Sequence, residues 1–143
     1  MISIHTGETI DTVYFRNGRY VPSAMKDIDW FMRDWRTNQS IRMDIRAVDT
    51  WSRLHQNLRA SRPLELISGY RTPETNAVLR ASSNGVAQRS LHTMGLAADL
   101  RLQGRTVAEI AHAATSAGAG GVGSYSRSKF VHVDVGPGRK WEG

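Results

Sequence analysis

Three residues of this chain have the side chains and spacing needed to hold a catalytic metal ion: His92, Asp99 and His132. Catalytic zinc sites use three protein ligands drawn mainly from His, Asp and Glu, and they leave one position for water. The chain contains no cysteine, so histidines and carboxylates are the strong zinc ligands that remain. The three residues therefore predict one Zn²⁺ per chain, held by two imidazoles and one carboxylate.

The secondary structure expected around these residues suits such a site. His92 lies in an expected loop, and Asp99 lies on the strand expected after that loop. On the strand expected over residues 130–135, His132 and Asp134 share one face because side chains alternate along a strand. The intervening valines then face the core. A metal ion with its bound water is a natural partner for a His and an Asp on the opposite face.

Hydrophobic spacing and turn signals predict an α+β fold, with a small, mainly antiparallel sheet flanked by helices, in a single domain over residues 1–143. Asn17-Gly18 lies between β-prone residues and predicts a hairpin. Thr72 and Thr106 have the positions of helix N-caps. Helices are expected over residues 24–35, 44–60, 73–81 and 106–117, strands over 64–67, 97–102 and 130–135, a loop over 82–85, and a short strand after the glycines of 118–123.

The composition narrows the possible partners. The net charge of +6 favours anionic surroundings, but no run of like charges and no nucleic-acid-binding module is present, so we expect no nucleic-acid partner. No stretch approaches the ~20 apolar residues of a membrane span. The segment Met1 to Gly7 has neither a basic start nor an apolar stretch and shows no signal peptide. The protein is then either cytoplasmic or described after removal of an export signal.

The sequence around the candidate ligands resembles a known family. Ser90, His92, Gly95, Ala97 and Asp99 match the pattern Ser-x-His-x-x-Gly-x-Ala-x-Asp of the zinc D-alanyl-D-alanine carboxypeptidases. The vancomycin-resistance D,D-dipeptidases and several phage endolysins share this pattern, and the hedgehog signalling domain has the same fold. The upstream Ser-Gly-Tyr-Arg-Thr of residues 68–72 is similar to their Ser-Gly-Tyr-Arg-Ser element.

One branch of that family is most similar. The segments 120–123 and 130–136, and the start His5-Thr6-Gly7-Glu8, resemble the murein endopeptidases of Gram-negative envelopes. The resemblance extends over nearly the whole chain. It implies a hedgehog/D,D-peptidase-like fold and a periplasmic zinc endopeptidase. The oligomeric state is open from the sequence, and a monomer is the default expectation. Its substrates would be the stem peptides of peptidoglycan, with cleavage of cross-links such as those joining two diaminopimelate residues.

The resemblance also implies roles for individual residues. His92, Asp99 and His132 would be the zinc ligands, and Arg71 would bind a substrate carboxylate or the oxyanion formed at the attacked carbonyl, a task that suits a planar, permanently charged group. Ser90 would support the first ligand. The remaining candidates for binding substrate or supporting the site are Tyr70, Gln88 and Arg89.

The general base departs from the family pattern. Many relatives have Asp or Glu three residues before the last His ligand, where this chain has Lys129. The nearest acid is Asp134, which the strand places on the same face as His132. Asp134 is therefore expected to act as the catalytic base or, alternatively, to accept a hydrogen bond that fixes the ring of the zinc-bound His.

Other functions remain open at this point. A D,D-carboxypeptidase or a phage-type endolysin acting from the cytoplasm would share the chemistry. A non-catalytic, zinc-stabilised module that binds the cell wall would share only the metal site, and Lys129 is the feature that favours it. His5, His55 and His112 are expected to have no role in the site, whereas Trp141 is a candidate for its edge.

Overall fold

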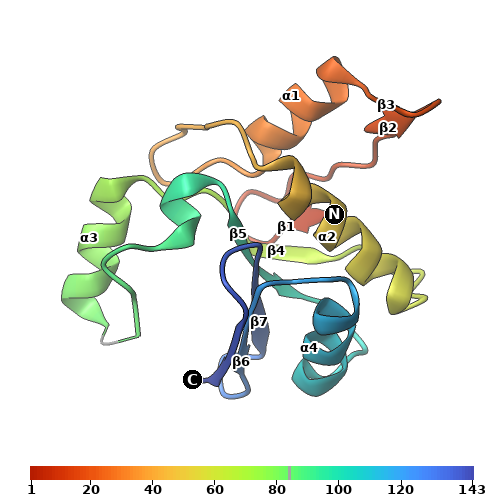
Figure 1. Cartoon of the computed structure of the whole chain (residues 1–143). Coiled ribbons are helices and arrows are strands. Elements are labelled where there is room, and N and C mark those ends of the chain that lie inside the picture. Colours follow the sequence, from red (N-terminus) through yellow and green to blue (C-terminus); the bar gives the residue numbers. More distant parts are fainter. Residues whose placement is uncertain (84) are drawn as a thin grey trace.

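The computed structural model describes residues 1–83 and 85–143, so Asn84, in the loop expected over residues 82–85, lies outside the described residues. Figure 1 shows the arrangement of the elements. The helices are α1 (Pro22–Phe31), α2 (Ile45–Asn57), α3 (Pro73–Ser82), the short 3₁₀ helix η1 (Leu91–Met94) and α4 (Val107–Ser116). The strands are β1 (Ile2–Ser3), β2 (Phe15–Arg16), β3 (Arg19–Tyr20), β4 (Glu65–Ser68), β5 (Ala97–Arg101), β6 (Gly121–Tyr125), β7 (Phe130–Asp134) and β8 (Arg139–Glu142).

The main sheet has six strands in the order β1-β4-β5-β7-β6-β8. The four central strands pair antiparallel, whereas β1 joins β4 and β8 joins β6 in parallel. The predicted α+β class and the mainly antiparallel sheet are therefore confirmed. The β2-β3 hairpin around Asn17-Gly18 is also confirmed.

The strand expected over residues 130–135 is confirmed as β7, but the sequence did not predict that another strand follows it. The chain turns after β7, and β8 adds a further strand at the edge of the sheet. The sequence of β8, Arg-Lys-Trp-Glu, is mostly charged and has no hydrophobic face. Arg139 and Lys140 are both exposed at this edge of the sheet. Alternation of hydrophobic residues therefore could not reveal this strand.

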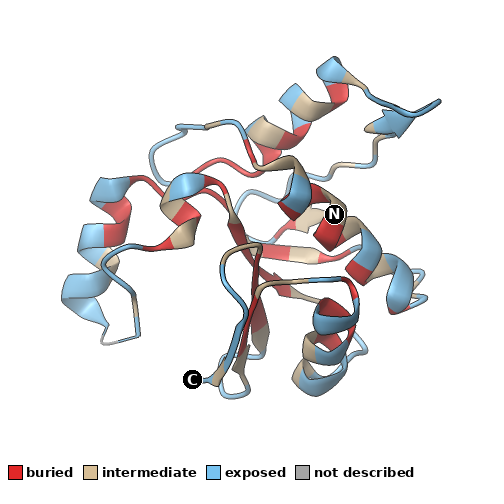
Figure 2. Cartoon of the chain, in the orientation of Figure 1, coloured by how far each residue is buried: buried red, intermediate tan, exposed pale blue. Residues whose placement is uncertain are grey.

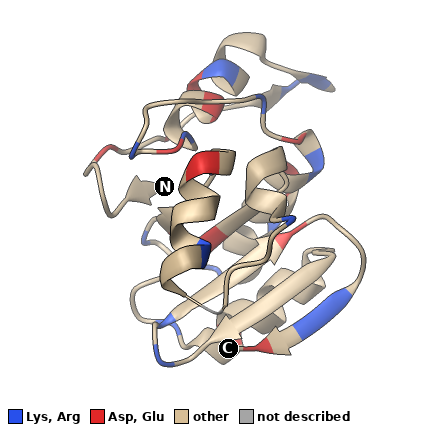
Figure 3. Ribbon diagram, turned by 90° about the vertical axis from the view of Figure 1, so that its left-hand side faces the viewer, with Lys and Arg blue, Asp and Glu red and all other residues tan. Residues whose placement is uncertain are grey.

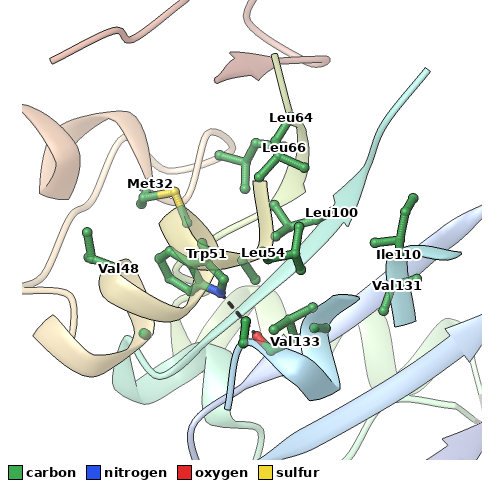
Figure 4. Close-up of a cluster of buried hydrophobic side chains, with 14 of the residues drawn as sticks. Met32, Val48, Trp51, Leu54, Leu64, Leu66, Leu100, Ile110, Val131 and Val133 are labelled. Carbon is green, nitrogen blue, oxygen red and sulfur yellow. Dashed lines mark hydrogen bonds between the residues drawn. The ribbon is translucent and has the colours of Figure 1, made fainter. Parts of the chain in front are cut away.

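The hydrophobic core lies on one face of the sheet. Helices α2 and α4 pack against each other over the strands, and their outward surfaces are exposed while the strands beneath are buried (Figure 2). Trp51 of α2 lies among the core side chains, and its indole N–H donates to the Val133 carbonyl of β7 over 3.4 Å (Figure 4). Val131 and Val133 are fully buried on this face, as expected. Because side chains alternate, their neighbour His132 points to the opposite face.

The ends of the helices follow local signals, with one exception. Thr72 caps α3, and Thr106 and Glu109 form the predicted capping box of α4. Helix α1 is shorter than predicted because the chain turns back after Met32, where the Asp34 and Gln39 backbones pair. The Met32 carbonyl then accepts a hydrogen bond from the Tyr70 backbone N–H at 2.7 Å. Within the described residues, no helix has the length and apolar character that a membrane crossing requires.

Candidate metal centre

The three predicted ligands lie together in the structure, and all three are buried. His92 Nε2 lies 3.2 Å from Asp99 Oδ1 and 3.1 Å from His132 Nδ1, and His132 Nδ1 lies 3.0 Å from Asp99 Oδ1. The ligand atoms of a tetrahedral zinc site with bonds of about 2.0–2.1 Å are separated by about 3.3 Å. The three atoms thus form a nearly equilateral triangle of the size that fits one face of such a site.

The sheet register accounts for two of the three positions. Asp99 of β5 lies directly opposite His132 of β7 in the antiparallel pair, so the two side chains emerge beside each other on one face. The third ligand comes from η1, where Ser90 is the N-cap and Gly95 ends the turn with φ of 70°. His92 was expected in a loop, and it lies instead on this single helical turn.

The second ring nitrogen of each histidine is also engaged. His92 Nδ1 lies 2.7 Å from the Gly69 carbonyl, an acceptor that requires the proton on Nδ1 and leaves Nε2 for a metal. His132 Nε2 lies 2.9 Å from Asp134 Oδ2, which in the same way leaves Nδ1 free. Such contacts to the far nitrogen are typical of metal-binding histidines.

Asp134 is fully buried and its carboxylate is occupied by several donors. Arg139 Nη2 donates to Oδ2 at 2.7 Å, and the backbone N–H groups of Gly121 and Gly136 donate to Oδ1 at 3.0 and 2.8 Å. Together with His132, these contacts use both carboxylate oxygens. The geometry favours an orienting role for Asp134 over that of a base that activates water at the ligand triangle.

The buried charges bias the centre toward holding a cation. Burial opposes ionisation of Asp99, but the neighbouring imidazoles His92 and His132 hold its pKa well below the usual range. Burial acts to lower the pKa of His132, yet hydrogen bonds to Asp134 and Asp99 raise it to about 9. Burial lowers the pKa of His92. Two carboxylates therefore surround His132, and positive charge between them, as a proton or a metal ion, is stabilised.

Two glycines of β6 leave room for the site. A Cβ atom on Gly121 would lie 2.2 Å from Asp134 Oδ2, and one on Gly123 would lie 2.5 Å from the Trp141 ring. Gly123 lies between His132 and Trp141 in the sheet register, so its missing side chain lets Trp141 reach across β6. The ring centroids of His132 and Trp141 are 5.2 Å apart. The glycines of β6 thus permit the close approach of Asp134 and Trp141.

Arg71 lies at the base of the same cleft. Its Nη2 is 3.5 Å from Asp99 Oδ2 and 3.3 Å from Ser68 Oγ, and its Nη1 donates to Asn76 Oδ1 at 3.3 Å. The guanidinium is therefore held in place beside the ligand triangle. Among the described residues, no acceptor lies within hydrogen-bond distance of its buried Nε.

The other predicted residues are distributed around the centre. Ser90 Oγ accepts from the His92 backbone N–H at 3.4 Å, and Arg89 is exposed at the cleft. The Tyr70 side chain is buried in the hydrophobic cluster. Gln88 is exposed, and the described lining of the cleft does not include it.

A cleft of about 330 Å³ opens above the ligand triangle. Besides the ligands, its walls carry the predicted Arg71, Arg89 and Trp141, and they also carry Tyr125 and Arg139, which sequence analysis missed. For Arg139, a signal was present in the sequence. Arg139 and Trp141 alternate in the same way as Gly121 and Gly123, but this matters only if β8 is known to pair with β6.

Comparisons with known proteins identify relatives of this chain. The family model described as "Peptidoglycan L,D-endopeptidase MepK" (Peptidase_M15_2) matches residues 1–141. The chain is 43% identical over 139 residues to peptidoglycan L,D-endopeptidase MepK of Escherichia coli K12, which is 97% of this chain and 76% of that protein. It is 39% identical over 142 residues to probable peptidoglycan L,D-endopeptidase MepK of Haemophilus influenzae, with 99% and 76% covered.

Proposed function

Because this chain belongs to the Peptidase_M15_2 family of peptidoglycan L,D-endopeptidases, we propose that it is a zinc-dependent enzyme that hydrolyses peptide cross-links of peptidoglycan. The bond cleaved is the one from an L-centre to a D-centre, as in links between two diaminopimelate residues. The observation that carries this proposal is the buried triangle of His92, Asp99 and His132, whose dimensions suit one zinc ion. The relatives' names support the substrate class.

The proposed ligands are His92 Nε2, Asp99 Oδ1 and His132 Nδ1, which leave a fourth position open toward the cleft. A zinc ion held by these three residues would supply Lewis-acid chemistry to the scissile carbonyl and to water. Gly69 and Asp134 hold the two rings in the orientation that ligation requires. Arg71 donates to the carbonyl oxygen as it gains negative charge, which a fixed guanidinium does without reorganising.

Cationic side chains suit the substrate. Arg71, Arg89 and Arg139 line the cleft, and stem peptides carry free carboxylates that guanidinium groups bind in pairs of hydrogen bonds. Figure 3 shows that basic and acidic residues elsewhere are interspersed over several elements. The positive charge relevant to the substrate is therefore that of the cleft. We place the working enzyme in the periplasm as a monomer.

Two alternatives differ in the outcome that they predict. A D,D-carboxypeptidase or endolysin would share the ligand triangle but cleave another bond. A non-catalytic wall-binding module would keep the metal and cleave nothing. The fixed Arg71 beside the triangle favours catalysis, because a purely structural site needs no such group.

The experiment is digestion of purified muropeptides. The substrates are dimers joined between two diaminopimelate residues, dimers joined from D-alanine to diaminopimelate, and pentapeptide monomers. We expect cleavage of the first dimer alone and its loss with a chelator, with activity restored by zinc. His112→Ala, an exposed histidine on α4, is the matched control and should behave as wild type. Zinc binding without cleavage of any substrate would contradict the enzymatic function, and cleavage of the second dimer or of pentapeptides alone would contradict the bond assignment.

A further inference from the structure

The hydroxyl of Tyr125 has an unusual arrangement beside the metal centre. Trp141 Nε1 donates to the Tyr125 oxygen at 3.0 Å. An indole N–H is only a donor, so the phenol oxygen must accept in this contact and its own proton remains free to be donated elsewhere. The Tyr125 ring is also fixed by stacking on Phe130, with centroids 4.5 Å apart and planes 12° from parallel.

The sheet register directs this pair of side chains to the cleft. Gly123 and Tyr125 alternate on β6, and Gly123 lies opposite His132, so Tyr125 emerges on the same face as the ligand triangle. Trp141 is next to Gly123 on β8 and reaches over it toward His132. Tyr125 and Trp141 both line the cleft with the three ligands.

The cleft otherwise offers few groups for proton transfer. Among the described residues that line it, the carboxylate is that of Asp99 and the imidazoles are those of His92 and His132, and all three are candidate ligands. Arg71, Arg89 and Arg139 contribute guanidinium groups, which are hydrogen-bond donors and not proton-transfer groups. Asp134 is buried behind His132, and Lys129 occupies the position where many relatives have an acid. Tyr125 thus has the one titratable side chain of the described lining that is neither a ligand nor a guanidinium.

We propose that Tyr125 is a catalytic residue, which donates its phenol proton to the leaving amine, and that Trp141 is the positioning residue that holds the phenol for this transfer. This inference rests on the proposed function, because it assigns a proton donor to that same reaction. It also gives β8 a function, since this strand supplies the indole that orients the phenol.

The step balances with water as the only other reactant. Water oxygen bonds to the carbonyl carbon, and the C–N bond then breaks with its electron pair remaining on nitrogen. The nitrogen takes the phenol proton and leaves as a neutral amine. The proton released from the attacking water restores the phenol. During the transfer, the Trp141 N–H, which already donates to the phenol oxygen, stabilises the phenolate.

Tyr125→Phe removes the hydroxyl and keeps the ring that stacks on Phe130. On the peptide cross-link we expect kcat to fall about 100-fold or more, as for loss of a general acid, with KM unchanged. On an analogue with a nitrophenyl ester in place of the scissile amide, whose leaving group needs no proton, the variant should react nearly as fast as wild type. Zinc content by mass spectrometry and binding of an uncleaved product peptide to the metal-free protein should also be unchanged. Tyr20→Phe, whose hydroxyl contacts Asp49 away from the cleft, is the control.

The role of Trp141 is tested in two backgrounds. Trp141→Phe should lower kcat on the peptide in the wild type and have little further effect in Tyr125→Phe, because the two residues act as a unit. Equal losses on peptide and ester would overturn the inference in favour of oxyanion binding or a structural role. Wild-type kcat in Tyr125→Phe would also overturn it while leaving the proposed function intact. A wild-type protein that cleaves no cross-link would overturn both.

Discussion

At the scale of single residues, the centre is defined by what each polar atom contacts. His92 and His132 have one nitrogen directed to the ligand triangle and the other bound to a fixed acceptor. The three proposed ligands could be predicted from the sequence because the motifs around them resemble those of the zinc D-alanyl-D-alanine carboxypeptidases. The sequence could not decide the role of Asp134, because that depends on contacts with Arg139 and with backbone N–H groups distant in the chain.

The role of Asp134 is tested by Asp134→Asn. The amide keeps the size of the side chain but loses the charge that stabilises His132, and its NH₂ group cannot accept the ring proton. We expect zinc affinity to fall about 10- to 100-fold, as for other groups that hold a metal-bound His, with cleavage restored at high zinc. Competition with a chromogenic chelator measures the affinity.

Asp49→Asn is the matched control, since Asp49 accepts from Tyr14 and Tyr20 far from the centre. If Asp134→Asn abolishes cleavage at saturating zinc while its zinc affinity equals that of wild type, Asp134 acts as the base and the orienting role is refuted.

At the scale of elements, the predictable parts were those with strong local signals. The caps Thr72 and Thr106, the turn at Asn17-Gly18 and the alternating valines of β7 all specify their structure from neighbouring residues. Strand β1 was missed because it has two residues and pairs with the distant β4, and β8 was missed because its sequence is mostly charged. Of the two β8 residues that line the cleft, Trp141 was predicted and Arg139 was missed.

The need for a glycine at position 123 of β6, where the Trp141 ring crosses the strand, is tested by Gly123→Ala. The added methyl group would lie 2.5 Å from the Trp141 ring, so the ring must move away from His132. We expect cleavage to fall at least about 10-fold, since small displacements at an active site have large effects on rate. The free energy of unfolding should fall by about 1–3 kcal/mol, as is typical of overpacking.

Gly138→Ala provides the comparison, because a Cβ atom there meets nothing within 4 Å. Kinetics with a muropeptide dimer and urea denaturation are measured for both variants. Wild-type kinetics in Gly123→Ala would show that the position of Trp141 does not matter to the reaction.

At the scale of the whole molecule, the hydrophobic core and the candidate site lie on opposite faces of the main sheet. One face packs on α2 and α4, and the other face carries Asp99, His132 and Trp141 around the cleft. Strand β7 contributes to both, because its valines lie in the core and its His and Asp lie at the centre. The core therefore fixes the position and direction of β7, which carries the proposed ligand His132.

This arrangement is tested by Trp51→Ala. Trp51 is 3% exposed and bonds to the Val133 carbonyl, so its removal leaves a cavity under β7. We expect the free energy of unfolding to fall by about 3–5 kcal/mol, as for other buried aromatic residues. Chemical denaturation followed by circular dichroism measures this change. Trp30→Ala, with Trp30 half exposed on α1, should cost much less, and equal losses in the two variants would contradict the assigned core.

The most direct test of the account is metal content measured together with cleavage, for wild type and for His92→Ala. Because His92, Asp99 and His132 form the only such cluster found among the described residues, we expect about one zinc per wild-type chain. In His92→Ala, zinc and cleavage of the diaminopimelate-linked dimer should be lost together while the circular dichroism spectrum is retained. A wild-type protein that binds no zinc after reconstitution, or a His92→Ala variant that keeps both its zinc and its activity, would contradict the central claim.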